Sequence, residues 1–172
     1  MIPDKNFATL LITSKGVDHL CLFDKSDQEL IEKYRWHLNG QGYASTRIKG
    51  KQVMMHRLIL GVVDHLEIEV DHIYHNPLDN RRAMIRTCTR AENSRNRAKR
   101  RGYSRFKGVY RENFWWHSQI CCDQKVINLG RYRSEVTAAK AYDRAARDLF
   151  GEFSNPNFIT HEPLPQQMKL AI

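Results

Sequence analysis

The chain has 172 residues and a formal net charge of +9, from 28 Lys and Arg against 19 Asp and Glu. Its length suits one domain or two small ones, and apolar residues at 41% are enough to form a core, which excludes a wholly disordered chain. No apolar run approaches the length of a membrane span, and the first residues lack the pattern of a signal peptide. We therefore expect a cytoplasmic protein that neither crosses a membrane nor is secreted.

The cysteines form no CxxC pair, and two of them are adjacent: Cys21, Cys88, Cys121 and Cys122. Structural zinc sites are usually built from such spaced pairs. We therefore expect no structural zinc, and we expect these four side chains to be reduced thiols.

Basic residues concentrate in the middle of the chain, where twelve lie between residues 81 and 111 and the acidic residues in or beside the stretch are Glu92 and Glu112. A solvated helix face normally mixes both signs, so this excess favours contact with phosphates. A membrane surface is disfavoured because no face rich in Trp and Leu opposes the basic residues. Double-stranded DNA is the expected partner.

Short apolar runs and turn residues predict small elements over the first 61 residues. Ser26, with Glu29 three residues later, has the pattern of a capping box, which predicts a helix running through Tyr34. His56 is either a DNA contact or a packed side chain. The other predictions are a hairpin of residues 9–13 and 20–23, a second hairpin of residues 43–48 and 52–55, and a short helix over residues 55–60 that ends at Gly61.

Two short strands and a helix are predicted in the next segment. Residues 70–73 have the pattern of a strand, and residues 85–89 form the second strand after an intervening turn. Thr89 and Glu92 have the spacing of another capping box. A helix is therefore expected over residues 90–100.

Three polar residues of this segment are candidates for a hydrolytic site. If the strands form a hairpin and the helix packs beside them, the Asp71 carboxylate and the Asn93 carboxamide converge. Two oxygen ligands with open positions suit Mg²⁺, which keeps waters and binds phosphate oxygens. His72 points to the opposite side of the strand, and its ordinary pKa of about 6.5 suits a general base acting on water.

Two stretches closely resemble the motif of the HNH homing endonucleases: VDHIYHNPLDNRR (residues 70–82) and CTRAENSRNR (88–97). Two further stretches resemble the region before this motif in phage members: MHRLI (55–59) and GYA (42–44). The resemblance implies a ββα-metal fold in which His72 is the general base of phosphodiester hydrolysis. It also implies that Asp71 and Asn93 hold one divalent metal, with Mg²⁺ expected and Mn²⁺ as the alternative. Phage provenance would place the protein in the cytoplasm of a bacterial host.

One position departs from this family, which has an Asn on the second strand where this chain has Met84. The family's Asn holds the active-site loop and so orients the base, whereas methionine offers only a weak acceptor. Loss of such a partner commonly lowers activity on the order of 10- to 100-fold. Two alternatives follow: a neighbour such as Asn80 substitutes, or the chain is a DNA-binding protein with weakened or absent catalysis.

The last segment predicts a three-stranded sheet covered by a helix, with Ser134 as the N-cap and Gly151 just after the end. The expected strands are residues 106–111, 115–121 and 125–129. Side chains alternate along a strand. The side chains expected toward the helix are Trp116, Ser118, Ile120, Ile127 and Leu129. Those expected on the outward face are Trp115, His117, Gln119, Cys121, Val126 and Asn128.

This segment resembles the Apetala2/ethylene-response-factor DNA-binding domain in four stretches: FKGVYR (residues 106–111), LGRY (129–132), AAKAYDRAA (138–146) and NF (157–158). The resemblance implies that the outward face of the sheet reads the major groove. Lys107 retains a basic contact residue of the family and Arg111 lies close to others. Base preference does not transfer, because Arg or Trp positions of the plant members are occupied here by Tyr110, Cys121, Val126 and Asn128.

These predictions combine into an α+β protein with three parts: an HNH domain at residues 1–102 with its ββα-metal motif at about 69–101, an Apetala2-like domain at 103–158, and a tail at 159–172. The protein is expected to be a monomer that nicks or cuts DNA. The predicted DNA contacts are Arg81, Arg82, Arg95, Arg97, Arg100, Arg105, Lys107, Tyr110, Arg111, Trp115, His117, Gln119 and Asn128. An RNA-binding protein is a third interpretation, since outward Trp115 and His117 can stack on bases.

Overall fold

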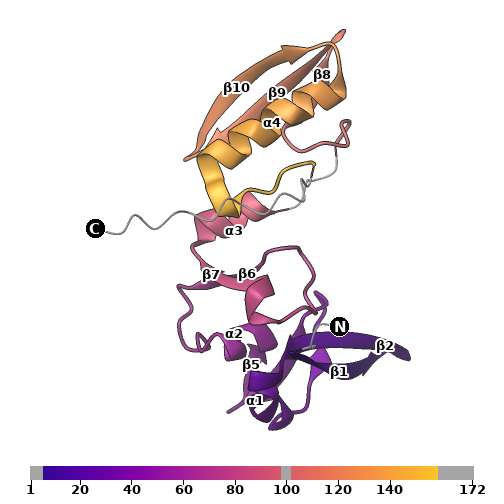
Figure 1. Ribbon diagram of the computed structural model, residues 1–172, viewed down its shortest axis with the longest axis vertical. Helices are drawn as coiled ribbons and strands as arrows, with labels where there is room; N and C mark the ends of the chain where they lie inside the picture. The colour runs from indigo at the N-terminus through magenta and orange to yellow at the C-terminus, as the bar shows by residue number, and fades with distance from the viewer. Residues whose placement is uncertain (1–5, 98–101, 159–172) are drawn as a thin grey trace. The chain divides into compact units, whose positions relative to one another are not determined.

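The computed structural model describes residues 6–97 and 102–158. The chain divides into two compact units, residues 1–97 and 98–172, which are described separately below (Figure 1). Both mix helices with small antiparallel sheets. Within the described residues, no helix is long and apolar enough to cross a membrane. The predicted tail at 159–172 lies outside the described residues.

The first unit begins with a hairpin of strands β1 (Phe7–Ser14) and β2 (Val17–Asp24), which pair in register along their full length. This confirms the first predicted hairpin. Strand alternation sends Ile12, Cys21 and Phe23 into the core, where all three are buried. The hairpin therefore forms one wall of the core of this unit.

The segment after β2 differs from its prediction. It forms a short 3-10 turn, η1 (Lys25–Asp27), followed by helix α1 (Gln28–Glu32). The N-cap of α1 is Asp27, without a side-chain capping bond, so the capping box predicted at Ser26 was wrong. The physical reason is that the buried Asp27 carboxylate pairs with the Arg82 guanidinium at 2.7 Å, a contact between distant parts of the chain.

The second predicted hairpin and the short helix after it are present: strands β4 (Ala44–Ile48) and β5 (Lys51–Met54), then helix α2 (Met55–Ile59). Gly61 has a φ of 71°, as suits a residue that ends a helix. A two-residue strand, β3 (His37–Leu38), adds to this sheet beside β4. It was not predicted because two residues show no period.

Strands β6 (Glu69–His72) and β7 (Ile85–Cys88) pair antiparallel and precede helix α3 (Arg90–Asn96), with the 3-10 turn η2 (Arg82–Met84) before β7. The capping box at the start of α3 is confirmed, because the Glu92 N–H donates to the Thr89 hydroxyl and the Thr89 N–H donates to the Glu92 carboxylate. The predicted extension of this helix to Arg100 lies partly outside the described residues; α3 itself ends at Asn96.

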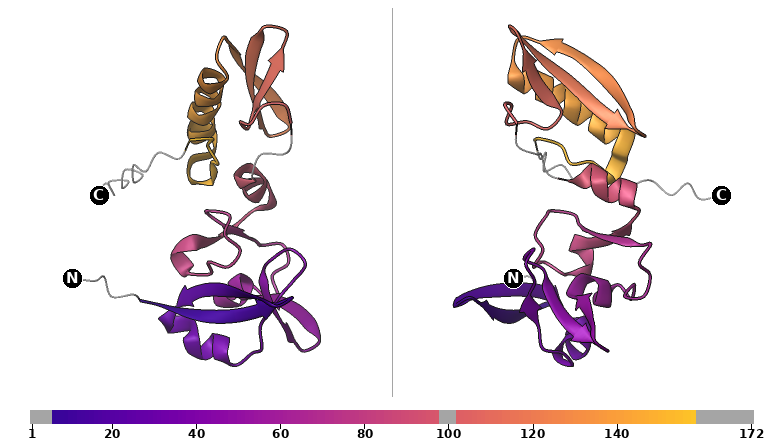
Figure 2. Two further views of the ribbon diagram at one scale, coloured as in Figure 1. Left: turned by 90° about the vertical axis from the view of Figure 1, so that its right-hand side faces the viewer. Right: turned by 180° about the vertical axis from the view of Figure 1, so that it is seen from behind.

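The long connection between β6 and β7 is docked on strand β2. The Leu22 N–H donates to the Leu78 carbonyl at 2.8 Å, and the Asn80 N–H donates back to the Leu22 carbonyl at 2.8 Å. Leu22 and Asp79 thereby form an isolated bridge. The first hairpin therefore braces a connection that is more than 50 residues away in the sequence (Figure 2).

The second unit contains strands β8 (Val109–Glu112), β9 (Trp115–Cys122) and β10 (Lys125–Tyr132), with β9 in the middle of the sheet. Helix α4 (Glu135–Phe150) covers one face and ends in the 3-10 turn η3 (Gly151–Phe153) (Figure 1). The three predicted strands and the helix are thus present. Ser134 is the N-cap by position, but its side chain makes no capping bond.

The two faces of this sheet largely follow the prediction. Ser118 and Ile120 are buried toward α4, and Gln119 and Cys121 are exposed on the opposite face. Ile127, predicted to point inward, pairs with Ile120 but remains 39% exposed.

A register shift between Asn128 and Gly130 changes the face of the residues that follow. Arg131 pairs with His117 and therefore lies on the open face, whereas simple alternation from Asn128 would send it to the helix side.

Candidate functional site

The end of β6 presents two adjacent side chains to opposite faces of the strand. Asp71 faces helix α3, where it contacts Asn96. His72 faces α2 and the connection after β6, where it meets His56 and Asn80. Both side chains are buried. This separation follows from the two-residue period of a strand, as the sequence predicted.

The Asp71 carboxylate is held by two partners. Oδ2 accepts hydrogen bonds from Arg86 Nε at 3.1 Å and Nη2 at 2.9 Å, and Arg86 is the residue paired with Asp71 across the hairpin. Asn96 Nδ2 lies 2.8 Å from Oδ1 and 2.7 Å from Oδ2. Asn96 is itself 2% exposed, so this carboxylate is enclosed by a cation and an amide.

Asn93, the predicted partner of Asp71, has a different neighbour. Its Nδ2 donates to the Glu69 carboxylate at 3.4 Å. Glu69 and Asp71 lie two residues apart on one face of β6, and Asn93 and Asn96 lie three residues apart on α3, so the two pairs run side by side. In the structure, therefore, Asn96 rather than Asn93 hydrogen-bonds the Asp71 carboxylate.

The donor set around Asp71 is compatible with a hard divalent cation, because it offers a carboxylate and nearby carboxamide groups. In the arrangement described, Asn96 presents its Nδ2 to Asp71, and Arg86 supplies the neutralising charge. A half turn of the Asn96 amide would direct its oxygen to the same place. A cation held by Asp71 would also replace the ion pair with Arg86.

His72 lies in a buried aromatic cluster. Its ring centroid is 5.0 Å from that of His56, in an edge-to-face arrangement, and 5.7 Å from that of Tyr43. Its Nε2 lies 3.4 Å from Asn80 Oδ1. Burial lowers the pKa of His72 below its ordinary value, and the hydrogen bond to Asn80 and the nearby Asp71 carboxylate oppose that shift. His72 is therefore neutral at pH 7.

His56 is a packed side chain, which was one of the two roles predicted for it; the other was a DNA contact. Its exposed fraction is 7%, and burial, helped by the neighbouring His72, lowers its pKa to about 3. Within the described part of the chain, its Nδ1 is a buried atom without a hydrogen-bond partner. His56 thus packs against His72 as a neutral ring.

Met84, which stands where the HNH homing endonucleases have an Asn, is the last residue of η2, just before β7. Met84 is half-buried, and its carbonyl accepts the Ile73 N–H at 3.0 Å, which closes the connection after β6. Asn80, a fully buried residue, places its Oδ1 within 3.4 Å of His72 Nε2. Asn80, predicted as a possible substitute for the family's Asn, is thus the residue beside the candidate base.

Two of the predicted DNA-contact residues form ion pairs within the first unit. Arg81 pairs with Asp79 at 2.6 Å, and its hydrogen bonds to that carboxylate, together with its charge, lower the pKa of Asp79. Arg82 pairs with Asp27 and also donates to the Ile59 carbonyl at 2.9 Å. In the structure, Arg82 therefore joins the connection after β6 to η1 and α2, whereas the Arg81 ion pair lies within that connection.

The arginines around the end of α3 differ in exposure. Arg95 is half-buried on α3, and Arg97, just after the helix, is exposed. Arg100 lies outside the described residues. In the second unit, Arg105 is exposed, with its Nε 3.7 Å from the Glu135 carboxylate.

The open face of the second unit carries an aromatic and cationic cluster. Tyr110 and His117 stack with ring centroids 5.2 Å apart. Arg131 and Arg133 lie over the Trp115 ring, at 5.2 and 5.6 Å from its centroid. We call these five residues the sheet-face cluster. Sequence reasoning missed both arginines. Arg131 was missed because the register shift in β10 is what places it on this face.

The other predicted contacts of this unit are distributed around the sheet. Gln119 and Asn128 are exposed on the open face and pair across β9 and β10. The exposed Arg111 lies over the ring of Trp116, a residue of the helix-facing side of the sheet, at 5.6 Å from the ring centroid. Lys107 is half-buried, and burial lowers its pKa to about 8, which weakens it as a permanent cation.

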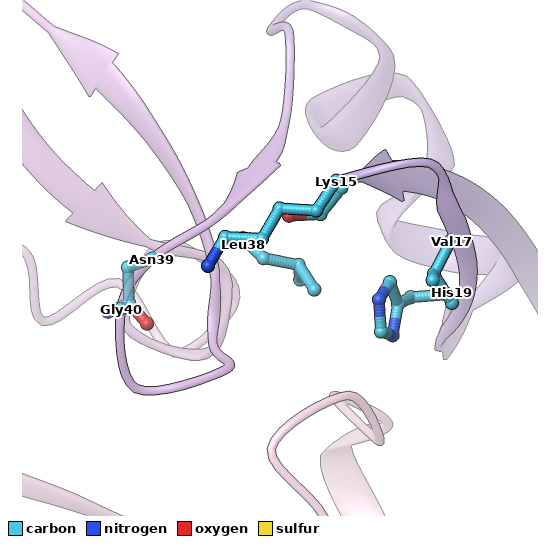
Figure 3. Close-up of a pocket in the computed structure, with 7 residues that line it drawn as sticks. Lys15, Val17, His19, Leu38, Asn39 and Gly40 are labelled. Atoms are coloured by element: carbon cyan, nitrogen blue, oxygen red, sulfur yellow. The ribbon is translucent and has the colours of Figure 1, made fainter.

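A shallow pocket of about 420 Å³ lies in the first unit but apart from these residues (Figure 3). It opens between the β1–β2 turn and the loop after β3, and its lining includes Lys15, His19 and Leu38. None of the predicted site residues contributes to it, so the candidate chemistry lies at the end of β6 and not in this hollow.

No protein-family model matches the chain. Over 157 residues it is 29% identical to an uncharacterized HNH endonuclease of Acanthamoeba polyphaga mimivirus, an alignment that covers 89% of this chain and 81% of the relative. Over 63 residues it is 38% identical to an ethylene-responsive transcription factor-like protein of Arabidopsis thaliana. That second alignment covers 37% of this chain and about a quarter (26%) of the plant protein. The chain is therefore similar to a viral protein named as an HNH nuclease and, in part, to a plant transcription-factor-like protein.

Proposed function

We propose that this chain is a metal-dependent DNA endonuclease of the HNH homing type, which hydrolyses a DNA phosphodiester with His72 as the general base. The observation that carries the proposal is the end of β6, where Asp71 meets the Asn96 carboxamide of α3 and the adjacent His72 lies buried and neutral on the other face. The name of the mimivirus relative supports the same class. A ββα-metal module built from β6, β7 and α3 belongs to this proposal.

In this proposal His72 removes a proton from the water molecule that attacks the phosphorus atom. Its lowered pKa favours the neutral imidazole, which is the form that can accept a proton. Asp71 would hold a divalent cation together with a carboxamide oxygen of Asn93 or Asn96. When bound, Mg²⁺ polarises the scissile phosphate and stabilises the leaving 3′-oxygen.

We further propose that the second unit binds double-stranded DNA through its sheet-face cluster. A small antiparallel sheet has the width of the major groove. Trp115, with Arg131 and Arg133 over its ring, offers an aromatic surface beside two cations. The plant relative's name, which calls it transcription factor-like, supports a DNA-binding role for this unit.

A plasmid-nicking assay with Mg²⁺ tests the nuclease proposal. The full chain should convert supercoiled DNA to open-circular or linear DNA, and His72→Ala should slow this roughly 10²- to 10⁴-fold through loss of the base. His65→Ala, at an exposed histidine of the same unit, is the matched control and should keep the parent rate. A His72→Ala variant that cuts as fast as the parent would show that the assigned base is wrong.

The same assay distinguishes the two carboxamides of α3. Asn96→Ala should weaken Mg²⁺-dependent cutting if the residue beside Asp71 is the ligand. Asn93→Ala should do so if the family's motif position is the ligand.

A second candidate function is DNA binding without cleavage, favoured by the Arg86 ion pair that occupies Asp71 and by the methionine at position 84. Nicking by Met84→Asn but not by the parent would support it.

A further inference from the structure

We propose that a buried hydrogen-bond chain running from Met55 through Cys21 and Asn80 fixes the tautomer of His72, with the proton on Nε2 and the lone pair on Nδ1. Asn80 is then a positioning residue for His72. The catalytic meaning of this inference, that Nδ1 is the atom that accepts the proton from water, rests on the proposed function. The tautomer itself does not.

The chain consists of three successive contacts. The Cys21 thiol donates to Met55 Sδ at 3.5 Å. Asn80 Nδ2 donates to Cys21 Sγ at 3.2 Å. Asn80 Oδ1 then lies 3.4 Å from His72 Nε2. The four residues come from α2, β2, the connection after β6, and β6.

The direction of every bond is set at the methionine end. A thioether sulfur has no hydrogen and can only accept, so the contact with Met55 requires Cys21 to donate. With its hydrogen used, Cys21 can only accept from Asn80, which requires the amide nitrogen of Asn80 to face it. The carbonyl oxygen of Asn80 therefore faces His72, and an acceptor there requires a hydrogen on Nε2.

Burial prevents the chain from reversing. Met55, Cys21 and Asn80 each have an exposed fraction of 0%, and His72 is 7% exposed, so bulk water does not compete for these groups. Burial also raises the pKa of Cys21 to about 11, so the thiol keeps the hydrogen that it donates at neutral pH.

The backbone holds the central link in place. The Asn80 N–H donates to the Leu22 carbonyl, next to Cys21 in strand β2. The side-chain contact between Asn80 and Cys21 is therefore made by two segments whose main chains are already hydrogen-bonded. The β1–β2 hairpin thus reaches the candidate base through one amide side chain.

Long-range ¹H–¹⁵N NMR on the full chain with ¹⁵N-labelled histidine tests the inference, because protonated and lone-pair ring nitrogens give distinct signals. The His72 signals are identified by their loss in His72→Gln. We expect Nε2 of His72 to carry the proton in the parent at pH 7. Neither metal nor DNA is needed for this measurement.

Two variants test the chain. Asn80→Leu removes the acceptor beside Nε2, and Met55→Leu, which conserves volume, removes the acceptor that sets the direction. The ratio of the Nε2–H to the Nδ1–H tautomer should fall about fivefold in each, as expected for one net hydrogen bond. Cys88→Ser, which changes a buried thiol on β7 outside the chain, should leave the ratio unchanged.

A His72 that carries its proton on Nδ1 in the parent would overturn the inference. So would a parent-like ratio in the folded Met55→Leu variant, since that result would mean that the methionine does not set the direction. A parent without nicking activity but with the expected tautomers would count against the proposed nuclease alone. The two proposals therefore fail separately.

Discussion

At the scale of single residues, the candidate site depends on neighbours that differ in polarity. Asp71 meets a guanidinium and an amide, whereas His72 lies among rings and a neutral amide, where burial lowers its pKa. One step along a strand is enough to separate these two environments, because consecutive side chains leave opposite faces. A carboxylate for a cation and a neutral imidazole for a proton can therefore be adjacent in sequence.

His56 should make the folded chain sensitive to acid. Its pKa falls from about 6.5 in the unfolded chain to about 3 in the folded one, so between these values only the unfolded chain takes up the proton. Stability should therefore fall as the pH drops through this window, by up to about 1.4 kcal/mol per pH unit. His56→Phe removes this loss, and urea unfolding at pH 4.5 should show it more stable than the parent by about 1–3 kcal/mol.

At pH 7 the two proteins should have nearly equal free energies of unfolding, since His56 is then neutral in both folded and unfolded chains. His65→Phe, at an exposed histidine, is the control and should unfold at acid pH like the parent. Equal acid sensitivity of His56→Phe and the parent would contradict the burial of this ring as the cause.

The sequence identified His72 and Asp71 as candidates but not the residue that contacts Asp71. Asn93 and Asn96 share one face of α3. Motif spacing does not say which of them lies beside Asp71, because that depends on the position of α3 along β6. Arg86 was not predicted as a partner of Asp71 either. Its position follows from the register of β6 and β7, which pairs the two residues across the hairpin.

At the scale of elements, the second unit depends on one close approach between helix and sheet. Gly108 has a φ of 73°, and a Cβ there would overlap the Tyr142 ring of α4 and lie 2.6 Å from the Gln119 carbonyl oxygen. Gly108→Ala should therefore lower the free energy of unfolding of this unit by about 2–4 kcal/mol, from overpacking and backbone strain together. Thermal or urea unfolding of the full chain measures it.

Gly16→Ala separates the two causes. Gly16 has a similar φ of 77°, but a Cβ there would meet nothing within 4 Å. This variant should lose only about 1 kcal/mol, from the left-handed backbone alone. A loss as small as this in Gly108→Ala would show that α4 does not depend on contact with the glycine.

Elements with a strong local signal were predicted, and those that depend on distant contacts were not. The paired strands and α4 follow from periods of two and 3.6 residues. The capping box at Thr89 is local and correct, whereas the one at Ser26 yields to an ion pair with Arg82. The shift in β10 has no distinct signature in the sequence, so the face of Arg131 was not predictable.

At the scale of the whole molecule, the positive charge should make DNA binding strongly dependent on salt. If six to ten phosphates are neutralised, affinity should fall by roughly 10³- to 10⁵-fold between 50 and 200 mM salt. Arg131→Gln should reduce the slope of log affinity against log salt by about 1, because it removes one contact of the sheet-face cluster. Fluorescence anisotropy with a labelled duplex measures both quantities.

Lys51→Gln is the matched control for charge. Lys51 is exposed at the start of β5 and belongs to no predicted DNA-contact set. Its slope should equal that of the parent. An Arg131→Gln slope that also equals the parent's would remove the sheet-face cluster from the DNA-binding surface.

The bridge between Leu22 and Asp79 has a consequence for anyone who trims or transplants this protein. Residues 69–97 contain the motif residues proposed for the nuclease site. On their own they would lack strand β2, to which the connection between β6 and β7 is hydrogen-bonded. A fragment that keeps this contact must therefore include the β1–β2 hairpin, which begins at Phe7. A fragment chosen by the motif alone would leave His72 without the strand that supports the connection beside it.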